Sequence, residues 1–67
     1  MKVEFLLQDQ VVLRLTKEEL MLISNALNEV CHGLDLPEFF TRMGVEQEEV
    51  KKLLNNIGSI IDKLAAT

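Results

Sequence analysis

The sequence contains few of the residues that stabilise very small proteins. Its 67 residues include a single cysteine, Cys31, so no disulfide can form within the chain. The one histidine, His32, follows directly, and the two together fall short of the four ligands that a structural zinc site needs. A hydrophobic core in so short a chain supplies only about 3–5 kcal/mol. Self-association therefore remains as the source of additional stability.

A long apolar segment is also missing. No run of about 18 hydrophobic residues occurs, although a membrane-spanning helix would require one. The first residues alternate in polarity and do not form the apolar segment of a secretion signal. Together with the lone cysteine, these absences predict a cytoplasmic protein without a membrane partner.

Positive charge is scarce. Seven Lys and Arg residues are outnumbered by eleven Asp and Glu residues, and the net charge is −4. An acidic surface repels the phosphates of nucleic acids and anionic lipids, so we expect a basic protein rather than a nucleic acid as an external partner. Hydrophobic residues make up 48% of a non-repetitive sequence, which predicts a folded chain.

Residues 2–15 alternate between apolar and polar side chains, which predicts an antiparallel β-hairpin around a three-residue connection, Gln8 to Gln10. The predicted register is the one that pairs opposite charges with each other and apolar side chains with each other across the two strands. Its predicted pairs are Leu7 with Val11, Phe5 with Leu13 and Val3 with Leu15 on the face toward the helices, and Glu4 with Arg14 and Leu6 with Val12 on the outer face.

Helical spacing begins after the hairpin. The run Thr16-Lys17-Glu18-Glu19 is a capping box and starts a helix over about residues 17–32. We expect Gly33 to end this helix in a left-handed conformation. The apolar stripe of the helix consists of Leu20, Ile23, Leu27, Val30 and Cys31.

Two further helices are predicted. A short one over 36–43 would be capped by Asp35, carry Pro37 in its first turn and end at Gly44. A long amphipathic one over 46–65 has Gly58 in its middle, which a close crossing of another backbone would explain. The predicted fold is therefore α+β, a two-stranded hairpin followed by a three-helix unit (ββααα), in a single domain spanning 1–67.

The turn at Gly44 and Val45 would permit a helix-turn-helix, and a transcriptional regulator is one alternative function. However, the residues that would enter the major groove first include Glu46, Glu48 and Glu49. Three carboxylates facing a polyanion, without a lysine or arginine to read guanine, argue against DNA binding.

Residues for catalysis are also lacking. Cys31 and His32 are neighbours, and neighbours on a helix point about 100° apart, so they do not form a nucleophile and base pair. We predict a buried Cys31, a solvent-facing His32, no enzymatic activity, no cofactor and no metal. The polar strip Asn25, Asn28, Glu29 and His32 is either solvated or tethers the next loop, with Asn28 or Glu29 accepting from the start of the second helix or from Arg42. A binding role is the third alternative.

The outer face of the hairpin is the most informative surface. A two-stranded sheet has two unpaired edges, and neither strand carries a proline or a run of lysines that would protect them. We therefore predict a homodimer, either edge to edge in a four-stranded sheet or face to face. The predicted self-interface consists of Glu4, Leu6, Val12 and Arg14.

The segments LTKEELMLISNALNEVCHGL and EFFTRMGVEQEEVKKLL resemble a group of small bacterial proteins that share a capped helix, an ALNEVC-G segment and a TR-GV turn before an acidic helix. The resemblance covers about residues 15 to 54 and implies no activity. This turn normally carries a serine where the chain has Glu46. Short acidic proteins also include immunity partners that mask a basic toxin, and in that alternative Glu46, Glu48 and Glu49 would bind the partner.

Overall fold

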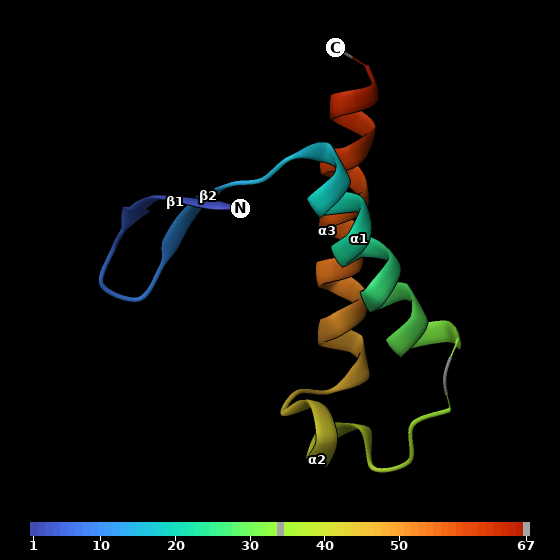
Figure 1. Ribbon diagram of the computed structural model, residues 1–67. Coiled ribbons are helices and arrows are strands. Elements are labelled where there is room, and N and C mark those ends of the chain that lie inside the picture. The colour runs from blue at the N-terminus through green and yellow to red at the C-terminus, as the bar shows by residue number, and fades with distance from the viewer. Residues whose placement is uncertain (34, 67) are drawn as a thin grey trace.

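A computed structural model describes residues 1–33 and 35–66 and confirms the ββααα architecture. Helices α1 and α3 lie side by side and run in opposite directions, while the β-hairpin projects away from them (Figure 1). A π-helical turn, η1, directly continues α1. The elements in chain order are β1 (Lys2–Leu6), β2 (Val11–Arg14), α1 (Lys17–Asn28), η1 (Glu29–Gly33), α2 (Phe39–Met43) and α3 (Gln47–Ala65).

Helix α1 begins with the predicted capping box. The backbone N–H of Glu19 donates to the Thr16 hydroxyl over 3.1 Å, and the backbone N–H of Thr16 donates to the Glu19 carboxylate over 2.9 Å. Two backbone donors that the first helical turn leaves free are thereby satisfied. The start of α1 is therefore fixed by local sequence.

The end of α1 differs from the prediction. Gly33 is not left-handed, because the helix widens into η1 and Gly33 is the last residue of that turn. A Cβ atom on Gly33 would lie 2.5 Å from the carboxylate of Glu29, so the glycine leaves room for this side chain. The widened turn also carries Cys31 into the core and leaves His32 exposed, as predicted.

Helix α2 is shorter than predicted and Asp35 does not cap it. The chain turns at Pro37 and Glu38, and the helix starts only at Phe39. A residue that precedes proline is disfavoured in helical conformation, which explains why Leu36 is excluded. Gly44 ends the helix in the left-handed region at φ 79°, where glycine is unstrained.

The hydrophobic core is small and lies between α1, η1 and α3. Its buried residues are Leu20, Cys31, Val50 and Ile57. Gln47, the first residue of α3, ties that helix to η1, because its side-chain amide donates to the Cys31 carbonyl over 2.8 Å. Glu46 precedes α3 and makes no side-chain capping bond. No helix in the described part of the chain is long and apolar enough to cross a membrane.

The hairpin register predicted from the sequence is wrong by one residue near the turn. Leu7 and Gln10 exchange backbone hydrogen bonds of 2.9 and 3.4 Å, so the connection contains two residues instead of three. A bulge at Glu4 then shifts the register again. The observed pairs are Leu6 with Val11, Phe5 with Val12, Val3 with Leu13 and Lys2 with Arg14.

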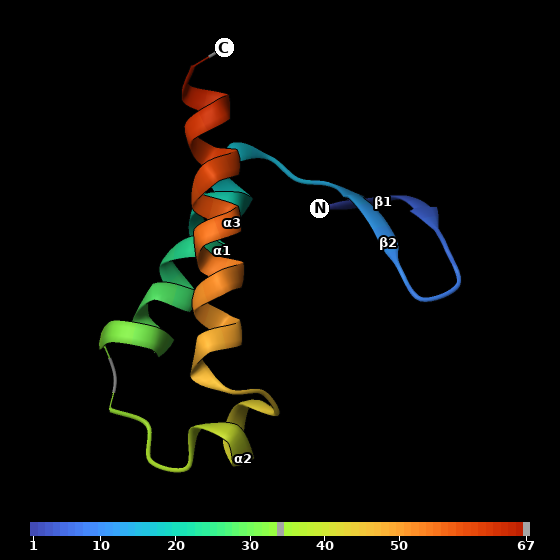
Figure 2. The same cartoon turned by 180° about the vertical axis from the view of Figure 1, so that it is seen from behind.

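The predicted packing of the hairpin on the helices is also not observed. Every residue of β1 and β2 is exposed, and the sheet stands clear of α1 and α3 in both views (Figures 1 and 2). Only Leu15 and Thr16 separate β2 from α1. The chain therefore presents two separate parts, an exposed ribbon and a pair of helices.

Candidate interaction surfaces

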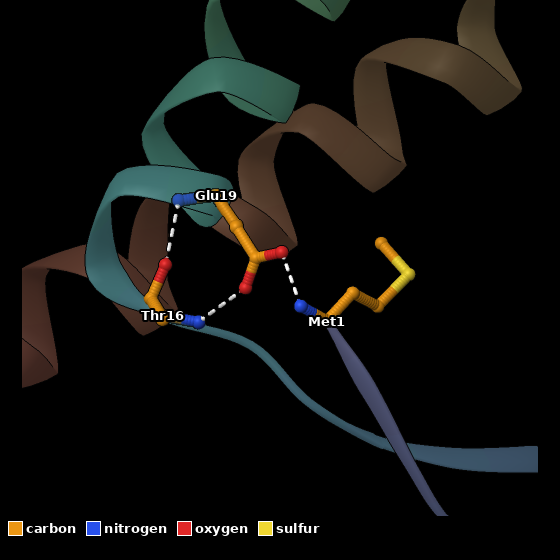
Figure 3. Close-up of polar contacts among 3 residues, drawn as sticks. All are labelled: Met1, Thr16 and Glu19. Atoms are coloured by element: carbon orange, nitrogen blue, oxygen red, sulfur yellow. Dashed lines mark hydrogen bonds and ion pairs between the residues drawn. The ribbon is translucent and has the colours of Figure 1, made fainter.

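A single carboxylate, that of Glu19, holds both ends of the hairpin at the start of α1. One oxygen accepts the Thr16 amide just after β2, and the other pairs with the amino group of Met1 just before β1 (Figure 3). The bond from the Met1 amino group, followed by the Thr16 amide, lowers the pKa of the Glu19 carboxyl below its ordinary value. The open end of the hairpin is thus anchored at a defined position.

This anchor predicts a pH dependence. Because the pKa of Glu19 is lowered in the folded protein, the contribution of the ionised Glu19 carboxylate to folding stability is complete at neutral pH. This contribution is lost as the pH falls through the lowered pKa. We expect the Thr16 amide resonance to titrate with the Glu19 carboxyl in an NMR experiment, at a lower midpoint than the same carboxyl in the urea-unfolded chain. An equal midpoint in both states would contradict the anchor.

The predicted interface residues of the hairpin are only partly brought together. Glu4 and Arg14 form an ion pair of 2.7 Å, as the sequence led us to expect, because the bulge lets Glu4 reach across. Leu6 and Val12, however, are paired with Val11 and Phe5. Since residues directly opposite one another share a face, Leu6 and Val12 lie on opposite faces of the sheet.

Both faces of the hairpin are consequently apolar and exposed. Phe5 is 65% exposed on the face of Val12, and Leu6 is 77% exposed on the face of Val11. Both sheet edges also lack a neighbouring strand, because β1 and β2 form the whole sheet of the described chain. A two-stranded ribbon with these features is marginally stable in isolation and is open to association.

The pair α1 and α3 has two unlike faces, and the first is a polar groove of about 600 Å³. Among the described residues, none of its polar side chains takes part in a hydrogen bond or an ion pair. Neither Asn28 nor Glu29 makes a side-chain hydrogen bond or ion pair with Arg42 or with another described residue, so the tether is not observed in the described chain. The groove is lined by Ser24, Asn25, Asn28, His32, Leu54, Asn55, Gly58, Ser59 and Asp62.

Gly58 in this groove is not explained by a close crossing of backbones. A Cβ atom added there would meet no atom within 4 Å. Gly58→Ala should therefore raise the free energy of unfolding by about 1 kcal/mol, because alanine restricts the unfolded chain and favours the helix. Urea unfolding followed by circular dichroism measures this gain. A loss of stability would show that the groove needs the glycine.

The second face of the helix pair is apolar. On α3, Leu53 and Ile60 are separated by seven residues, share one side and are about half exposed. On α1 and its continuation η1, Ile23, Ala26 and Val30 follow the same helical spacing. The helical rotation places these residues on the side opposite to the groove, because Asn55 and Asn25 point the other way. We call Ile23, Ala26, Val30, Leu53 and Ile60 the open face.

The acidic start of α3 is exposed but partly neutralised. Glu48 pairs with Lys51 over 3.6 Å, and Glu49 pairs with Lys52 over 3.3 Å. Each glutamate therefore uses the lysine three residues later. Glu46 is exposed as well. These pairs partly neutralise the negative charge at the start of α3.

Comparisons with protein-family models, with curated proteins and with solved structures find no match for this chain. The resemblance to small bacterial proteins thus stays a prediction. The surfaces of the molecule are the remaining source of functional information.

The total exposed surface is large for the mass of the protein. The accessible area is 5503 Å² for 7.6 kDa, whereas a compact monomer of this mass exposes roughly 4,300 Å². The radius of gyration is 13.6 Å, against about 11 Å for a compact chain of this length. Each chain thus exposes about 1,200 Å² beyond what a compact domain does.

Proposed function

We propose that the protein is a non-enzymatic, cytoplasmic interaction module that acts as a homodimer and associates through its N-terminal hairpin. The observation that carries this proposal is the hairpin itself, with apolar side chains exposed on both faces and no packing on its own helices. Exposed apolar patches of this kind mark interaction sites. The small core adds support, because only four of the described residues are buried and so small a core stabilises a chain only marginally.

The area that is available fits a stable dimer. If each of two chains buries its excess of about 1,200 Å², the interface totals about 2,400 Å², within the range of obligate dimers. A second copy is favoured over a different protein because like chains meet in closed, self-complementary interfaces and supply both halves of the contact. Dimerisation by this route leaves the polar groove and the acidic start of α3 exposed for other contacts.

Light scattering of the wild-type protein tests the proposal. We expect the mass of two chains at high micromolar concentration, because the dimer contributes stability that the single chain lacks. Dilution should lower the thermal midpoint measured by circular dichroism, since an obligate dimer is less stable when its chains are dilute. A single-chain mass at high micromolar concentration would overturn the proposal.

A further inference from the structure

The open face and the hairpin lie on the same side of the molecule. Glu19, which binds the Met1 amino group, precedes Ile23 by four residues, and this spacing continues with Ala26 in α1 and Val30 in η1. Residues so spaced line one side of a helix. The hairpin is therefore attached on the side of α1 that carries the open face, and away from the polar groove.

The attachment holds the hairpin away from the open face of its own chain. Only Leu15 and Thr16 connect it to α1, and Thr16 is fixed in an extended conformation by the capping box. The other end is held by the bond from Met1 to Glu19. Two anchors on one carboxylate leave little freedom for the ribbon to fold back, and the ribbon stands clear of the helices (Figure 2).

We infer that the hairpin of each chain packs on the open face of the second copy in an arm-exchanged dimer. This inference rests on the proposed function and names the surface that receives the hairpin. In a dimer with a two-fold axis, the hairpin of each chain contacts the helices of the other, and the two contacts are identical. The result is a sheet packed on a pair of helices, the two-layer arrangement by which α+β domains bury their apolar faces.

Other modes of dimerisation cover less apolar surface. Contact between the two hairpins alone leaves Leu53 and Ile60 exposed, and contact between the two open faces alone leaves Phe5 and Leu6 exposed. Arm exchange covers one face of each hairpin and both open faces in a single interface. It draws on both of the apolar surfaces that the single chain leaves exposed.

Paramagnetic relaxation between chains tests the inference with a matched pair of neighbouring asparagines. Asn56 borders the open face on α3, whereas Asn55 lines the polar groove on the other side. In a Cys31→Ala background, a nitroxide is attached at Asn56→Cys or at Asn55→Cys. Each nitroxide-labelled protein is then mixed with ¹⁵N-enriched Cys31→Ala protein, which carries no nitroxide. Only contacts between different chains then broaden the observed amide signals.

The expected result is loss of the hairpin amide signals, from Val3 to Val12, with the label at residue 56 and their retention with the label at residue 55. A dimer in which the hairpin signals survive the label at residue 56, or are lost equally with both labels, overturns arm exchange and leaves the proposed dimer standing. A monomeric mass for the Cys31→Ala protein and the wild type overturns the proposed function itself. Light scattering on the same samples separates these two failures.

Discussion

Leu6→Asp combined with Val12→Asp is expected to convert the dimer into a monomer. The two residues lie on opposite faces of the hairpin, so the double variant places a carboxylate in whichever face is buried against the partner. An uncompensated buried charge costs about 3–5 kcal/mol. Even one such charge weakens dimerisation at least about a hundredfold in Kd. Light scattering at high micromolar concentration measures the resulting mass.

The matched control adds the same two charges at the tip of the hairpin, with Gln8→Asp and Gln10→Asp. Gln8 lies in the two-residue turn and Gln10 follows it, and neither carries an apolar side chain, so the control should retain the mass of two chains. Far-ultraviolet circular dichroism distinguishes dissociation from loss of the helices. If the Leu6 and Val12 variant keeps its full dimer mass, neither face of the hairpin contributes to self-association.

Local features of the fold were predictable from the sequence because they depend on neighbouring residues. The capping box at Thr16 and Glu19 needs only a spacing of three, and the burial of Cys31 follows from its place in an apolar stripe. The fold class follows from the spacing of the apolar residues, whose period changes from two residues to about 3.6 residues at Thr16. These predictions agree with the structure because each depends on the spacing of residue types along the chain.

The register of the hairpin was not predictable in the same way. No glycine marks the first residue of the turn, so connections of two and three residues fit the sequence equally well. One bulge at Glu4 then restores the contact of Glu4 with Arg14 within a different register. The ion pair was predicted correctly and the faces of Leu6 and Val12 were not, because pairing is set by the turn and the bulge together.

Contacts between distant residues were also beyond the sequence. The bond from Gln47 to the Cys31 carbonyl spans sixteen residues, and its polar donor gives no periodic signal. The polar strip on α1 was recognised, but its meeting with Asn55, Ser59 and Asp62 depends on how α1 and α3 rotate about their axes. The exposed position of the hairpin depends on the anchor at Glu19, which joins Met1 to a residue eighteen positions away.

Ile57→Ala is expected to abolish cooperative folding of the single chain, whereas Ile60→Ala should be tolerated when the protein is dilute. Ile57 is 9% exposed and belongs to the core, while Ile60 is 46% exposed on the open face. Truncating a buried isoleucine costs about 2–5 kcal/mol, which equals the stability expected of so small a core. Thermal unfolding monitored by circular dichroism at low micromolar concentration compares the two variants.

The same pair of variants reports on dimerisation when the protein concentration is raised. Ile60 becomes buried if the partner covers the open face, so the loss caused by Ile60→Ala should grow with concentration relative to wild type, because the variant gains less from association. Ile57 is buried in the single chain and in the dimer, so the loss of stability caused by Ile57→Ala should change little with protein concentration. An Ile60→Ala effect that does not change with concentration would mean that the open face stays in contact with water in the dimer.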